Sequence, residues 1–201
     1  MPNPPGYRPG VWKVDAESSR IEFSIHQLAT QARGQFTNYD VAGVATEDIA
    51  GSSVTAMIDL TSIDTGNPTR DKHLRGRGFL NVRGYPAMRY RSTGVRHTAD
   101  GLVVDGELEL HGTTRAVQLR VELDRFTTDT AGNWRASLSA GGQISRREFG
   151  LGIPMAAGSR SRTRSRSGSE WRPSSRAEGL GYGDGDGDGW RESTARFSSS
   201  Q

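Results

Sequence analysis

The residues best suited to chemistry form a short run in the middle of the chain, namely Arg70, Asp71 and His73. On a β-strand, Asp71 and His73 would share a face and could work as an acid and base pair. A loop that contains Arg70, Asp71 and Asp64 more often secures itself by charge-assisted hydrogen bonds, and we favour that structural interpretation. Catalysis on an apolar small molecule through Asp71 and His73 stays open as an alternative.

Other signatures of catalysis or metal binding do not occur in the sequence. The chain has four histidines and no cysteine, and no histidine has a second His or Glu at the spacing of a helical metal site. The Gly-x-Ser-x-Gly elbow, the P-loop and the Rossmann fingerprint are missing as well. We therefore expect a protein that is not an enzyme and that has no catalytic residue, no metal site and no cofactor.

Composition divides the 201 residues into three parts. Residues 1–10 are a Pro-rich extension, residues 11–157 are rich in Val, Ile and Leu, and residues 158–201 are built mainly from Ser, Arg and Gly. The net charge of +3 is too slight to indicate nucleic-acid binding by the whole molecule. No apolar stretch reaches the roughly 18 residues of a membrane span, and no secretory signal is evident, so we expect a cytoplasmic protein.

The C-terminal segment is predicted to be a disordered tail. After Met155 it contains no Val, Ile or Met, so it cannot bury enough apolar surface to offset its ordering entropy. The arginines that alternate between Arg160 and Arg166 could hold a nucleic-acid backbone, and a nucleic-acid adaptor is a second alternative function. The run from Asp184 to Gly189 imitates the start of a calcium loop but has no closing Glu, so we interpret it as low complexity.

The body alternates apolar and polar residues with a period of two, which predicts half-buried β-strands. Short connections favour antiparallel pairing, and the continuous polar face favours a closed barrel over a sandwich. The fold class is therefore all-β, an antiparallel barrel of about eight strands. The stretch of residues 65–86 breaks the rhythm and is the expected place for function. The predicted strands cover residues 11–14, 20–25, 35–46, 54–61, 88–96, 102–110, 117–124 and 134–145.

Several spaced motifs within residues 12–152 resemble the YceI-like family of polyisoprenoid-binding proteins. The motif loop consists of Arg70, Asp71, His73, Leu74, Tyr85 and Pro86. Further matching positions are Gly106, Leu108, Gly112 and Thr114, and then Arg146, Phe149 and Gly150. The resemblance implies a lipocalin-like, extended barrel whose apolar interior holds an isoprenoid or related long-chain lipid, without catalysis. The candidate ligand-binding residues, chosen from the alternation and the loop, are Phe23, Ile25, Phe36, Ile58, Phe79, Tyr90 and Leu108.

One departure from the family concerns the last strand of the barrel. Family members usually continue after the late Phe-Gly motif through a strand of alternating Val and Ile, whereas this chain passes into the Ser/Arg-rich tail. We therefore expect a barrel that lacks its closing strand, a gap that the tail cannot fill, and open backbone groups along its edges. We hypothesise that the C-terminus is out of frame or truncated; if it is genuine, we expect a less stable molecule or a homodimer.

Overall fold

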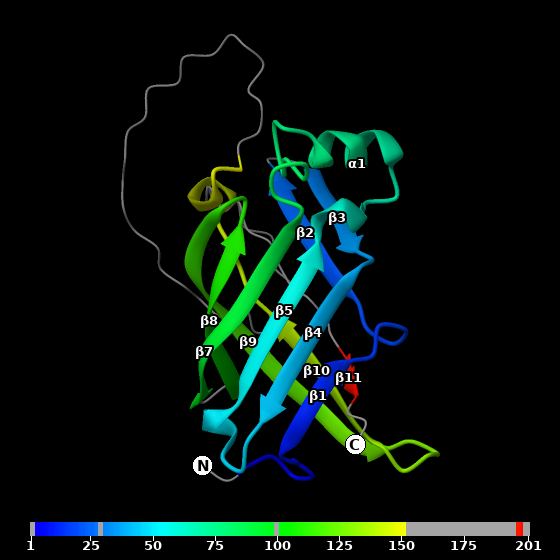
Figure 1. Ribbon diagram of the computed structural model, residues 1–201, viewed down its shortest axis with the longest axis vertical. Coiled ribbons are helices and arrows are strands. Elements are labelled where there is room, and N and C mark those ends of the chain that lie inside the picture. Colours follow the sequence, from blue (N-terminus) through cyan, green and yellow to red (C-terminus); the bar gives the residue numbers. More distant parts are fainter. Residues whose placement is uncertain (1–2, 28–29, 99–100, 152–195, 199–201) are drawn as a thin grey trace, which may run out of the picture.

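Eight strands form a closed antiparallel ladder in the order β1-β11-β10-β9-β8-β7-β5-β4 (Figure 1). The computed structural model describes residues 3–27, 30–98, 101–151 and 196–198. The predicted all-β, lipocalin-like barrel is confirmed. The barrel strands are β1 (Gly10–Val14), β4 (Tyr39–Ala45), β5 (Ser53–Asp59), β7 (Ala87–Thr98), β8 (Gly101–Leu110), β9 (Thr113–Thr128), β10 (Trp134–Gly141) and β11 (Arg196–Ser198).

A second, smaller sheet stands beside one end of the barrel. It consists of β2 (Ile21–Gln27), β3 (Thr30–Phe36) and β6 (Ile63–Asp64). The single strand predicted over residues 35–46 is wrong, because the chain turns at Thr37 and Asn38 and leaves one sheet for the other. Asn38 holds this turn, since its backbone N–H donates to Ser62 Oγ (3.0 Å) and its side chain donates to Asp59 Oδ2 (3.0 Å).

The gap beside β10 is partly filled by the tail. In the ladder, β11 pairs with Lys13 and Val14 of β1 on one side and with Arg135–Ser137 of β10 on the other. The expectation that the tail cannot fill the gap is therefore wrong for Arg196–Ser198. The arginine run and the Asp184 motif lie outside the described residues, as does the rest of the predicted disordered tail.

Alternation sorts side chains between the core and the solvent as the sequence predicts. On β5, Ile58 is 6% exposed whereas its neighbour Met57 is 50% exposed. On β8, the inward side chains of Leu102, Val104 and Leu108 are all buried. Because adjacent strand residues point to opposite faces, this contrast fixes the register of each strand relative to the core.

A short helix interrupts the predicted long loop. Helix α1 (Pro68–Arg75) begins at the N-cap Asn67, whose side chain accepts hydrogen bonds from the backbone N–H groups of Thr69 and Arg70 (both 3.1 Å). Pro68 follows at the first helical position, where its missing N–H costs nothing. Among the described residues, no helix combines the length and the apolar character that crossing a bilayer requires.

The two ends of the barrel differ in what covers them (Figure 1). The α1 end carries α1, β6 and the loop of residues 76–86. The β1 end is the opposite end, where β1 starts. There, residues 3–9 pack against the β4–β5 connection, and Tyr7 Oη lies 2.9 Å from the carbonyl oxygen of Thr46, to which it donates. The Pro-rich segment is thus in contact with the barrel.

Candidate functional site

The candidate site is the apolar interior of the barrel. The residues predicted to bind a ligand all lie in one buried core, and the rings of Phe23 and Phe36 pack with centroids 5.3 Å apart. Their inward direction agrees with the alternation, while their contact with a ligand stays a prediction. The buried members of this set are Phe23, Ile25, Phe36, Ile58, Phe79, Tyr90 and Leu108.

Side chains fill the interior at the α1 end. Leu60, Leu80 and Phe149 are almost completely inaccessible to solvent. Leu60 belongs to a 3-10 turn (Leu60–Ser62), and Phe149 belongs to another (Arg146–Phe149). Since protein interiors pack as densely as organic crystals, we expect a chain-like ligand to enter this end only if side chains move.

A band of inward side chains nearer the β1 end is only half-buried. It comprises apolar residues on three strands that pack against the core and yet keep part of their surface accessible. Sequence reasoning assigned most of them to the inward face but did not select them as ligand contacts. The part of an inward apolar side chain that the protein leaves accessible can be buried by the chain of a bound lipid. We define the half-buried band as Val54, Ala56, Val95, Leu119 and Val121.

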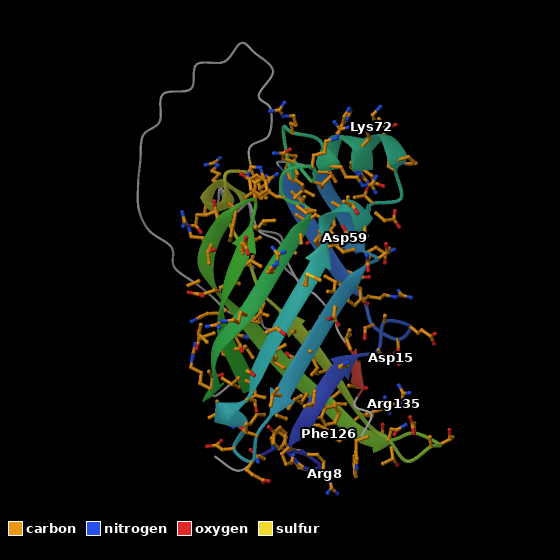
Figure 2. The ribbon with its side chains drawn as sticks, in the orientation of Figure 1. Arg8, Asp15, Asp59, Lys72, Phe126 and Arg135 are labelled. Carbon is orange, nitrogen blue, oxygen red and sulfur yellow. The ribbon has the colours of Figure 1, made fainter. Side chains whose placement is uncertain are left out.

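Aromatic residues close the β1 end below this band. Trp12 of β1 is buried, and its ring lies 6.1 Å from that of Phe126. Tyr7 contacts the same phenylalanine edge-on at 6.3 Å, and the Arg8 guanidinium lies 4.4 Å from the centroid of Trp134. Figure 2 shows Arg8 and Phe126 together at this end. The half-buried band therefore lies between a packed α1 end and an aromatic base.

The seam next to β11 is held by an ion pair. Arg135 Nη1 lies 2.8 Å from Asp15 Oδ2, and Figure 2 shows the two residues side by side. Arg135 Nε also lies 3.4 Å from Asp129 Oδ2. Hydrogen bonds from Ser18 and Arg135 lower the pKa of Asp15 below its ordinary value, so this carboxyl is ionised at neutral pH. β11 lies between β1 and β10 in the barrel. The ion pair links the residue after β1 directly to β10, past this short strand.

The motif loop uses its charged residues to secure its own backbone. Asp71 is buried and accepts hydrogen bonds from the backbone N–H (3.0 Å) and the hydroxyl (2.6 Å) of Thr65. Arg70 donates through Nε to Thr65 Oγ1 (2.8 Å) and through Nη2 to Thr65 O (2.7 Å). Asp64 accepts from the N–H of Gly66 (2.8 Å), which lowers the pKa of this carboxyl. These contacts support the structural interpretation of the loop.

The predicted geometry for an acid and base pair is wrong. Asp71 and His73 lie two residues apart on a helix, not on a strand, so their side chains leave the axis about 200° apart. Asp71 is buried against Thr65, whereas His73 is exposed. Leu74, on the same helix, packs half-buried against the core. Within the part of the chain that the structure describes, no three His, Cys, Asp or Glu residues are grouped to hold a metal ion.

The Tyr85-Pro86 pair rests on the β8–β9 hairpin. The ring of Tyr85 lies 4.5 Å from that of His111, and Leu60 N–H donates to Pro86 O (2.8 Å). His111 and Gly112 both adopt positive φ (54° and 73°), as a tight two-residue hairpin turn requires. A Cβ on Gly112 would lie 2.7 Å from Tyr85 Cε1, so the ring needs glycine at this position. The motif loop thus joins α1, the barrel core and a hairpin.

Known proteins are similar to this chain in sequence and in fold. A family model described as YceI-like domain matches residues 12–164. A UPF0312 protein of Yersinia pestis (strain Pestoides F) is 36% identical over 155 residues, which cover 74% of this chain and 80% of that protein. A UPF0312 protein of Yersinia enterocolitica is 34% identical over 153 residues, with coverage of 74% and 80%.

Solved structures agree in fold at low sequence identity. BcnA of Burkholderia cenocepacia is similar with a TM-score of 0.68 and 15% identity, over 92% of this chain and 99% of that one. A polyisoprenoid binding domain of Saccharophagus degradans, described as implicated in plant cell wall breakdown, is similar with a TM-score of 0.56 and 13% identity, over 96% and 100% of the two chains. The barrel, the motif loop and the match over residues 12–164 lead to one conclusion: the chain belongs to the YceI-like family.

Proposed function

We propose that this protein binds one isoprenoid or related long-chain lipid inside its barrel and holds or carries it without catalysis. The observation that carries the proposal is the half-buried band, in which inward apolar side chains of β5, β7 and β9 remain partly uncovered. The polyisoprenoid binding domain of Saccharophagus degradans, which has a similar fold, supports this class of ligand.

The energetics favour exchange of the lipid over irreversible capture. Each buried methylene contributes about 0.8 kcal/mol relative to water, so about ten carbons give near 8 kcal/mol before the entropy cost of binding. In a cell, however, the lipid starts from a membrane, where its chain is already out of water. Most of the gain then disappears, and the protein exchanges its lipid with another apolar phase.

The two alternative functions receive less support. The enzyme alternative needs a free carboxylate at Asp71, which is instead buried and bonded to Thr65. It also needs His73 beside that carboxylate, and the helix turns His73 to solvent. The nucleic-acid alternative rests on the arginine run of the tail, which lies outside the described residues.

Organic extraction of the purified protein followed by mass spectrometry tests the proposal. We expect one long-chain isoprenoid or related lipid in near-stoichiometric amount. Protein refolded from denaturant without lipid should take up a prenyl alcohol added from detergent micelles. Absence of lipid in the native extract, together with failure of the refolded protein to bind the prenyl alcohol, would overturn the proposal.

A further inference from the structure

A basic pocket lies on the outer surface of the α1 end. It has a volume of about 310 Å³ and is formed by the last turn of α1 and the loop that follows. Its size is at the lower end of the range for small-molecule sites, about 300–1,000 Å³. Figure 2 shows Lys72 at this tip of the molecule, far from Phe126 at the β1 end. The basic pocket is lined by the cations Lys72, Arg75, Arg77 and Arg83, and by Asn81.

Positive charge in this pocket exceeds the negative charge near it. Four of its lining residues are cations and none is a carboxylate. The ion pairs found among the described residues involve Arg89, Arg96 and Arg135, and none involves a cation of the pocket. Asp71 directs its carboxylate to Thr65, and Asp64, whose charge interacts weakly with Arg75, accepts from the N–H of Gly66. The four cations therefore repel one another, and a bound anion would relieve that repulsion.

The pocket is built on fixed backbone. Arg75 donates through Nε to Thr61 O (2.8 Å) and through Nη2 to Ile63 O (2.5 Å), two neutral acceptors that orient the guanidinium without cancelling its charge. The following loop folds back on the helix end, since Asn81 N–H donates to Gly76 O (2.9 Å). Asn81 itself holds a positive φ of 47°. A site whose walls are ordered before binding loses less entropy when a ligand arrives.

We infer that the basic pocket binds a phosphate or diphosphate group. Arginine forks match the oxygens of phosphate with paired, charge-assisted hydrogen bonds, and three arginines and a lysine line this pocket. The group belongs either to a lipid headgroup at a bilayer surface or to a free phosphorylated molecule, and the same oxygens are recognised in both cases. This site is separate from the barrel interior and does not depend on lipid in the barrel.

Binding of inorganic diphosphate, measured by titration calorimetry at low ionic strength, tests the site directly. The pocket variant combines Arg77→Gln with Arg83→Gln and leaves the backbone contacts of Arg75 intact. The control variant combines Arg91→Gln on β7 with Arg125→Gln on β9, two exposed arginines outside the pocket lining whose removal changes the net charge by the same amount. We expect diphosphate affinity to fall at least about tenfold in the pocket variant and to change little in the control. Thermal unfolding checks that both variants are folded.

Vesicle flotation distinguishes the two sources of the phosphate. The full chain is mixed with phosphatidylcholine vesicles, with or without phosphatidic acid. Binding that requires phosphatidic acid and is lost in the pocket variant supports a headgroup at a bilayer, whereas diphosphate binding alone supports a free phosphorylated molecule. Failure of the wild-type chain to bind either probe, or equal losses in the two variants, would overturn the inference.

Discussion

The ring of Tyr90 on β7 lies directly over Gly106 on β8. A Cβ built on Gly106 would be 2.4 Å from Tyr90 Cζ and 2.7 Å from the carbonyl oxygen of Arg91. Tyr90 Oη donates to Val104 O (3.1 Å), so the ring is fixed in place. Beside it, the β7–β8 register shifts between Ser92 and Gly94. The irregularity of the ladder thus lies on β7, opposite Gly106, and Gly106 makes room for the ring.

Replacement of Gly106 by alanine should destabilise the barrel by about 1–3 kcal/mol, because the new methyl group overlaps both a fixed ring and backbone. Gly94→Ala is the matched control, since a Cβ at Gly94 meets no atom within 4 Å. Its free energy of unfolding should stay within about 0.5 kcal/mol of wild type. Urea denaturation measures both variants, and equal stability of Gly106→Ala and wild type would contradict the contact.

Stability should fall at high pH because of Tyr90. Burial, with a smaller effect of the Asp105 charge, raises the pKa of Tyr90 from its ordinary 10.0 to about 12. Between these values the unfolded chain releases the phenolic proton while the folded chain keeps it, so rising pH stabilises the unfolded state. The free energy of unfolding should therefore decline more steeply between pH 10 and 12 in wild type than in Tyr90→Phe. Parallel slopes in urea denaturation at several pH values would show that Tyr90 is not buried in this way.

Removal of the Asp71 carboxylate should loosen the motif loop. Asp71→Ala removes the acceptor of two part-buried donors, the backbone N–H and the hydroxyl of Thr65. We expect the free energy of unfolding, measured by heat or urea, to fall by about 1–3 kcal/mol. His73→Ala changes an exposed side chain and should leave both stability and lipid content unchanged. A drop in lipid content or the appearance of an activity that depends on His73 would instead favour the enzyme alternative.

Alternation in the sequence predicts most of the barrel. A period of two indicates that a segment is a β-strand, and it also shows which of its side chains face the core. It places Ile58 inside and Met57 outside, in agreement with their exposure in the barrel. It also separates the strands predicted over residues 102–110 and 117–124, which the structure joins by a turn at His111 and Gly112, two consecutive residues with positive φ. In each case the signal is local, so neighbouring residues are enough to read it.

Features that depend on distant parts of the chain could not be predicted in this way. β2 alternates like a barrel strand, but its partner β3 and the short β6 draw it into a separate sheet. β11 follows a long polar segment of the sequence, and it forms a strand because its backbone pairs with the edges of β1 and β10. Helix α1 had a local signal in Asn67-Pro68, an N-cap followed by proline, which the irregular loop around it concealed.

The half-buried band gives the sharpest test of lipid binding inside the barrel. Val121 on β9 faces inward and is half-buried, pairing with Leu102 and Ala140, while its neighbour Glu122 is exposed on the opposite face. Val121→Trp should fill the space that a lipid needs and remove most of the lipid that co-purifies with the protein, at a stability cost of about 1–3 kcal/mol. Glu122→Trp adds the same side chain outside and should retain the lipid.

Mass spectrometry of extracts from equal amounts of folded protein measures the difference between the two variants. If Val121→Trp does not fold, Val54→Trp and Thr55→Trp form an equivalent pair on β5, one half-buried and inward and the other exposed. Because the two members of each pair differ only in the face that receives the indole, a difference in lipid content reports the interior itself. Equal lipid content within both pairs would place the lipid elsewhere and remove the barrel interior as its site.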